Sequence, residues 1–187
     1  MTPQGIPSAE RPRSRALTPH MCKEVDLVIA AIEHGNPELD FPNAGSILSW
    51  YREGKSQRFG DERIEEARLK DIACVERLLG VFASHPDAAR GLCEAQLVRS
   101  VRRLEAISRD MTENEAEEIL DMFDTREAVH ELRELLMSLS GNMADIDDRI
   151  AEVDEVLRSH ESWLKGLASP FYDARISRKP AEYWWWH

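Results

Sequence analysis

The stretch MFDTREAVHELRELLMSLSGNMADIDDRIAEVDEVLRSHESWLKGL, residues 122–167, decides the fold prediction. Apolar residues recur in it every 3.5 residues, and this spacing lets a helix bury one edge against a partner. Thr125 and His160 are the two exceptions in the seam. The segment 112–168 holds 16 acidic and 5 basic residues, a net of −11 that equals the charge of the whole chain. Such an acidic helix is typical of an assembly element and unsuited to wrapping nucleic acid.

We expect this acidic heptad segment to build a homo-oligomer. Ser138, Ser140, Gly141 and Asn142 are poor helix formers, so the segment can either form a hairpin or continue as one helix. We favour the hairpin because its two arms would be nearly equal in length and could bury their seams on each other. The residues expected at the oligomer interface are Met122, Val129, Leu132, Leu136, Leu139, Met143, Ile146, Ile150, Val153, Leu157 and Leu164.

The rest of the chain also indicates helices. Charged residues are abundant and β-branched runs are scarce, which predicts an all-α protein. We divide the chain into a disordered arm (1–19), a helix-turn-helix-like domain (20–60), a helical pair (61–111), the heptad segment (112–168) and an aromatic tail (169–187). Thr112 and Glu115 form a Thr-x-x-Glu capping box at the start of the heptad segment.

Residues 20–60 outline two short helices joined by a tight turn. Gly35 and Pro37 are expected to end the first helix, and Pro42 with Asn43 to begin the second. The outer face of the second helix offers small polar residues and cations, which suit a DNA groove. An ordinary solvated helix face has the same pattern. The candidate DNA-binding residues are Asn43, Ser46, Ser49, Arg52, Lys55 and Arg58.

The sequence PNAGSILSW (42–50), followed by Phe59, Ile64 and the Ala67–Arg68 pair, resembles the N-terminal helix-turn-helix of phage terminase small subunits. Here the Trp-to-Phe spacing is about two residues longer than the common pattern, and Ser49 replaces the usual basic residue. The resemblance implies a non-catalytic, ring-forming subunit that binds duplex viral DNA and hands it to a large motor subunit. The alternative is a structural helical adaptor or scaffold that binds protein partners through its coiled coil and its tail.

The tail ends in Tyr183-Trp-Trp-Trp-His187. Trp184, Trp185 and Trp186 either dock on a partner or fold back onto the chain, and the sequence favours neither. The chain shows no phosphate-binding loop, nucleophile elbow or metal-ligand cluster, so we expect no enzyme, no cofactor and no metal. His130 is interpreted as a surface residue.

Cys22, Cys74 and Cys93 are far apart and odd in number, which favours three buried, reduced thiols in a cytoplasmic protein. No apolar run approaches the roughly 20 residues of a membrane span, so no membrane partner is expected.

Overall fold

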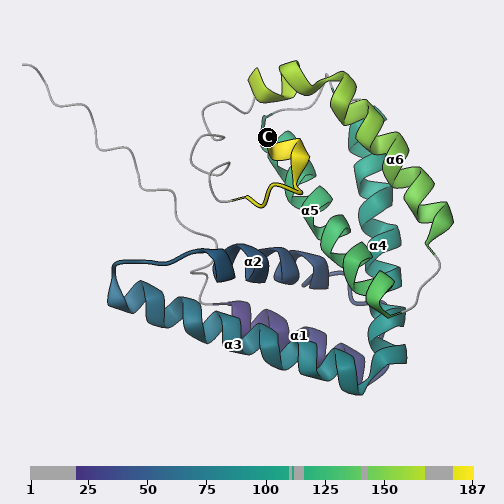
Figure 1. Ribbon diagram of the computed structural model, residues 1–187. Coiled ribbons are helices and arrows are strands. Elements are labelled where there is room, and N and C mark those ends of the chain that lie inside the picture. Colours follow the sequence, from purple (N-terminus) through teal and green to yellow (C-terminus); the bar gives the residue numbers. More distant parts are fainter. Residues whose placement is uncertain (1–19, 110, 112–115, 140–142, 167–178) are drawn as a thin grey trace, which may run out of the picture.

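The computed structural model describes residues 20–109, 111, 116–139, 143–166 and 179–187 (Figure 1). Regular structure in these ranges is entirely helical, which confirms the all-α class. The predicted disordered arm, the Thr112–Glu115 capping box and part of the tail lie outside them. The elements are α1 (Met21–Glu33), α2 (Ala44–Ser56), α3 (Glu62–Ser84), α4 (Pro86–Arg109), α5 (Ala116–Ser138), α6 (Ala144–Ser159) and the 3-10 turn η3 (Trp184–Trp186).

Local signals set the helix boundaries. The Asn43 side chain accepts a hydrogen bond from the Gly45 N–H at 2.8 Å and begins α2. Asp61 begins α3 in the same way, by accepting from the backbone N–H groups of residues 63 and 64. Gly35, just after α1, has a φ of 65°, a left-handed conformation that glycine adopts without strain.

The helices form two groups that share one core. Figure 1 shows α1, α2 and α3 lying side by side, with α4, α5 and α6 rising from them. The most extensive packing joins α4 to α5 and α2 to α5, and α1 packs mainly on α3. Buried apolar side chains from all six helices and from the last residues of the chain belong to a single cluster. The site described below lies where α2 crosses α5.

The heptad seam faces the interior of the chain itself. Every seam residue named above as an oligomer contact is buried, except for the half-buried Leu139 and Ile146. The buried ones are Met122, Val129, Leu132, Leu136, Met143, Ile150, Val153, Leu157 and Leu164. Because the apolar seam is already removed from water by other helices of the same chain, it needs no second chain to cover it. The pattern that predicted a homo-oligomer is therefore explained by core packing. Assembly of several chains stays a prediction.

α5 ends at Ser138 and α6 begins at Ala144, so the segment holds two separate helices, as the hairpin hypothesis requires. The two arms nevertheless bury their seams mainly on other helices: both pack on α4, and α5 also packs on α2. Polar bridges link the arms. Arg126 donates two hydrogen bonds of 2.8 Å to Asp154, and Arg133 donates two to Asp147 at 2.7 and 3.1 Å. Heptad spacing predicts a buried edge but does not identify the helix that covers it.

The structure contradicts the prediction that all three cysteines are reduced. Cys22 on α1 and Cys74 on α3 form a disulfide, with Cα atoms 5.5 Å apart, so the prediction of three reduced thiols is wrong for this pair. The two residues are 52 positions apart in sequence, and the periodicity of each helix does not show which residues of its neighbour lie opposite. Cys93 is free and buried, and burial raises the pKa of its thiol to about 12. In the described part of the chain, no helix is long and apolar enough to cross a membrane.

Candidate functional site

α2 and α5 lie in close contact at Gly45. A Cβ atom placed on Gly45 would overlap with the carbonyl oxygen of Ala128. One turn later on α2, Ser49 is only 2% exposed, and its hydroxyl donates to Glu127 Oε2 at 2.5 Å. Two small residues four positions apart therefore let α5 lie directly on the polar side of α2.

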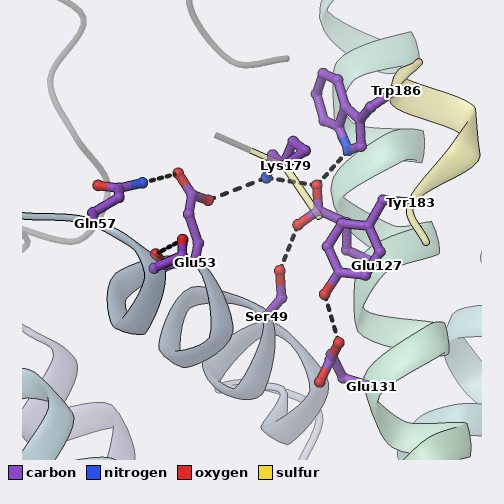
Figure 2. Close-up of polar contacts among 9 residues, drawn as sticks. Ser49, Glu53, Gln57, Glu127, Glu131, Lys179, Tyr183 and Trp186 are labelled. Atoms are coloured by element: carbon purple, nitrogen blue, oxygen red, sulfur yellow. Dashed lines mark hydrogen bonds and ion pairs between the residues drawn. The ribbon is translucent and has the colours of Figure 1, made fainter. Parts of the chain in front are cut away.

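The C-terminal tail completes a buried polar cluster at this crossing, which we call the tail cluster: Ser49, Glu127, Glu131, Lys179, Tyr183 and Trp186 (Figure 2). Glu127 Oε1 accepts from the Trp186 indole N–H at 2.5 Å and lies 2.6 Å from Lys179 Nζ. Glu131 Oε1 accepts from the Tyr183 hydroxyl at 2.5 Å. At the edge of the cluster, Lys179 also reaches Glu53 Oε2 at 3.3 Å. The tail thus binds the two carboxylates that α5 presents toward α2.

Burial governs the ionisation of the tail cluster. It raises the pKa of both Glu127 and Glu131, against the opposing effects of Lys179 on the first and of Tyr183 and Arg52 on the second. Burial also raises the pKa of Tyr183, so its hydroxyl stays a donor at neutral pH. Both carboxylates are occupied by partners from the tail and α2, so the cluster leaves neither of them open to a substrate.

The structure decides between the two interpretations of the tryptophans. Trp185 and Trp186 are buried and Trp184 is half-buried, all within the same chain. The Trp186 ring lies 5.0 Å from that of Phe123. Arg126 stacks on Trp185 at 4.4 Å and Arg158 on Trp184 at 4.2 Å. Trp184, Trp185 and Trp186 therefore pack on α5 and α6 of the same chain, and docking on a partner stays a prediction.

Three of the six predicted DNA-binding residues contact other parts of the chain through their side chains. Ser49 is buried under α5, which contradicts its expected outward position. Arg52 forms ion pairs with Glu131 at 2.9 Å and Glu182 at 2.7 Å. Asn43 caps its helix and donates to the Ser100 hydroxyl at 3.2 Å. These three side chains are therefore engaged in packing.

The other three predicted DNA-binding residues have different surroundings. Lys55 and Arg58 are exposed at the end of α2. Ser46 lines a cavity of about 650 Å³ that is open to solvent, between the 39–43 loop, α2, α4 and α5. The cavity is also lined by His20 and Glu24 at the start of α1, Asp40, Phe41, Asn43, Trp50, Gln96, Arg99, Ser100, Arg103, Asp121, Asp124, Thr125 and Ala128.

Hydrogen bonds from α4 hold the loop that forms one wall of this cavity. Gln96, buried on α4, accepts from the Ala44 N–H at 2.8 Å and donates to the carbonyl oxygens of Leu39 at 2.9 Å and Pro42 at 3.2 Å. Arg99 donates to Leu39 as well, at 2.9 Å. The cavity wall is therefore fixed before any ligand binds, which reduces the entropy lost on binding.

Both arginines that line the cavity are paired with carboxylates, but not every carboxylate is paired with an arginine in the part of the chain that the structure describes. Arg99 pairs with Asp40 at 2.6 Å and Arg103 with Asp121 at 2.5 Å, so each arginine already has a counter-charge. Glu24 differs, because its Oε2 atom is buried without a hydrogen-bond partner among the described residues. Burial raises the pKa of this carboxyl. The lining holds four carboxylates and two arginines, a formal net of −2.

Sequence reasoning missed both the tail cluster and the cavity. The pair Gly45 and Ser49 was a usable signal, because small residues one turn apart on a polar face allow a second helix to approach. No local pattern connects the 39–43 loop to Gln96, which is more than 50 residues away. His130, interpreted as a surface residue, is half-buried, with its ring 5.3 Å from that of Tyr183.

No group of three or more His, Cys, Asp or Glu side chains in the described ranges could hold a metal ion. Comparison with protein-family models, with curated proteins and with solved structures gives no match.

Proposed function

We propose that this chain is a non-catalytic helical binding module, an adaptor whose ligand site is the cavity between the 39–43 loop, α2, α4 and α5. The observation that carries the proposal is the cavity itself. Its volume of about 650 Å³ lies within the ordinary range of ligand sites, and its wall is fixed by Gln96. Phe41, at the cavity, is 72% exposed and offers an apolar contact beside it.

The adaptor hypothesis is favoured over DNA recognition because of where α2 lies. A recognition helix must present its polar face to a groove, and here Ser49 and Arg52 contact α5 and the tail. Lys55 and Arg58 are exposed, yet two cations neutralise few phosphates, and non-specific affinity grows with the number neutralised. The sequence predicted that an adaptor would bind partners through the heptad seam and the aromatic tail. Other helices of the same chain cover the seam and the residues Tyr183, Trp185 and Trp186, so the cavity is proposed as the binding site instead.

Filling the cavity tests the proposal. Ser46→Met places a larger side chain into the cavity from α2, whereas Ser56→Met makes the same change at an exposed position of the same helix. We expect small ligands that raise the melting temperature of the wild type to lose this effect with Ser46→Met and keep it with Ser56→Met.

The ligand set should include amines, carboxylates, sugars and nucleotides, with duplex DNA at low salt assayed separately by gel shift. The proposal is contradicted if no member of the set stabilises the protein. A gel shift abolished by Lys55→Glu with Arg58→Glu, but not by Ser46→Met, would favour DNA recognition.

A further inference from the structure

We infer that the cavity binds the ammonium or guanidinium group of an organic cation, with Glu24 as its principal counter-charge. This inference rests on the proposed function and names the ligand class of the same site. Its first support is geometric. Glu24 lines the cavity, and its Oε2 atom is buried with no hydrogen-bond partner in the described part of the chain. A buried acceptor without a donor is costly, and a cationic N–H donor would satisfy it with a charge-assisted hydrogen bond.

The remaining charges favour a cation over an anion. An anionic ligand would be drawn to Arg99 and Arg103, but Asp40 and Asp121 already pair with these side chains at 2.6 and 2.5 Å. Asp124 adds another carboxylate to the same lining. An anion would therefore meet arginines that are already paired with carboxylates, whereas a cation meets a lining with a net negative charge.

The aromatic side chains at the cavity suit the same ligand. Trp50 and Phe41 both line it, and the faces of aromatic rings attract alkylammonium and guanidinium groups. Ser46, which makes no side-chain hydrogen bond within the described residues, offers a hydroxyl acceptor on the α2 side. The cavity thus combines a carboxylate, aromatic faces and a neutral acceptor, which together suit an amine with an apolar stem.

Three linear five-carbon probes test this chemistry by calorimetric titration of the full-length protein. Cadaverine carries two ammonium groups, glutarate two carboxylates, and pentane-1,5-diol two hydroxyls. We expect cadaverine to bind more tightly than either of the other probes. Glu24→Gln should weaken cadaverine binding about tenfold or more, because a charge-assisted hydrogen bond is lost.

Glu33→Gln is the matched control. Glu33 is exposed near the end of the same helix and does not line the cavity. The Glu33→Gln variant should therefore bind cadaverine with the same affinity as the wild type. The Glu24 carboxylate accepts no hydrogen bond from the described residues, so its substitution removes none, and circular dichroism checks that the variant folds. If it does not fold, Glu24→Asp, which withdraws the carboxylate by one methylene, should weaken binding in the same direction.

A second arm separates a free amine from the lysine of a protein partner. A capped pentapeptide Ala-Ala-Lys-Ala-Ala is compared with the same peptide carrying norleucine in place of lysine. Binding of the lysine peptide alone would identify a protein side chain as the ligand, and binding of cadaverine alone would identify a free amine. Either result supports the cation inference.

The outcomes separate this inference from the proposed function. The cation inference would be overturned if the diol or glutarate bound at least as tightly as cadaverine. If Ser46→Met abolished that binding, the cavity would still be a ligand site. Equal cadaverine affinity for wild type and Glu24→Gln would also overturn the cation inference. No binding by any probe, together with no stabilisation across the wider ligand set, would contradict both.

Discussion

Gly45 on α2 lies directly against Ala128 on α5, because no Cβ fits between the Gly45 Cα and the Ala128 carbonyl oxygen. We predict that Gly45→Ala lowers the free energy of unfolding by about 1–3 kcal/mol, since the two helices must separate to admit the methyl group. Urea unfolding followed by circular dichroism measures the change.

Gly54 provides the control on the same helix. A Cβ atom there would meet no other atom within 4 Å, so Gly54→Ala should be neutral or stabilise the protein by up to about 1 kcal/mol through helix propensity. Equal effects of the two substitutions would show that α2 and α5 do not cross at Gly45.

The folded-back tail gives a second prediction. Trp186 is fully buried and donates to Glu127, so Trp186→Ala should cost about 3–5 kcal/mol of unfolding free energy. Deletion of residues 183–187 should likewise lower the melting temperature.

Tryptophan fluorescence provides an independent measurement of the tail. With Trp50 and Trp163 replaced by Phe, the emission of Trp184, Trp185 and Trp186 should be blue-shifted in the free protein. Solvent-like emission, with a melting temperature unchanged by the deletion, would instead indicate a tail that docks on a partner.

The pair formed by Glu65 and Arg68 predicts a pH dependence. Arg68 is buried, its Nε–H donates to Glu65 Oε2 at 2.9 Å, and its Nη2 donates to Oε1. These hydrogen bonds lower the pKa of Glu65 from 4.5 to about 2. A carboxyl whose pKa is lower in the folded state stabilises the fold above its unfolded pKa and loses this effect as the pH falls through the folded value.

We therefore expect wild type to be more stable than Glu65→Gln at pH 7, with the difference shrinking as the pH falls from about 4.5 toward 2. Chemical unfolding at a series of pH values measures it. Glu66→Gln, at an exposed neighbouring position, serves as the control and should show little difference from wild type at any pH. A difference between wild type and Glu65→Gln that stays constant from pH 7 to 2 would refute the assignment.

Local signals in the sequence predicted the elements well. Asn43 and Asp61 cap helices as their side-chain chemistry requires, and Gly35 ends α1 in the left-handed conformation. Helix capping depends on residues within one turn, so the sequence is sufficient to predict it. The heptad period likewise identified the buried edge of α5 and α6.

The partners of those buried edges could not be predicted. The apolar seam residues fit an oligomer, a hairpin or a core equally well, since each arrangement would cover the same edge of the helix. Ser49 was predicted to face solvent because an amphipathic pattern predicts that a helix has a single buried face. In the structure, α2 is covered by α5 as well as by α1 and α3, so Ser49 on its polar side is buried too. The contact of Glu127 with Trp186 spans 59 residues, a separation over which no periodic pattern carries information.

Ser49, on the α2 face predicted to bind DNA, is an interior residue, and the free energy of unfolding of Ser49→Arg tests this most directly. Ser56→Arg, an exposed change on the same helix, should stay within about 0.5 kcal/mol of wild type. Because Ser49 is buried against Glu127, we predict that Ser49→Arg destabilises the protein by about 3 kcal/mol or more. A Ser49→Arg protein as stable as the wild type, with increased affinity for duplex DNA, would contradict the account.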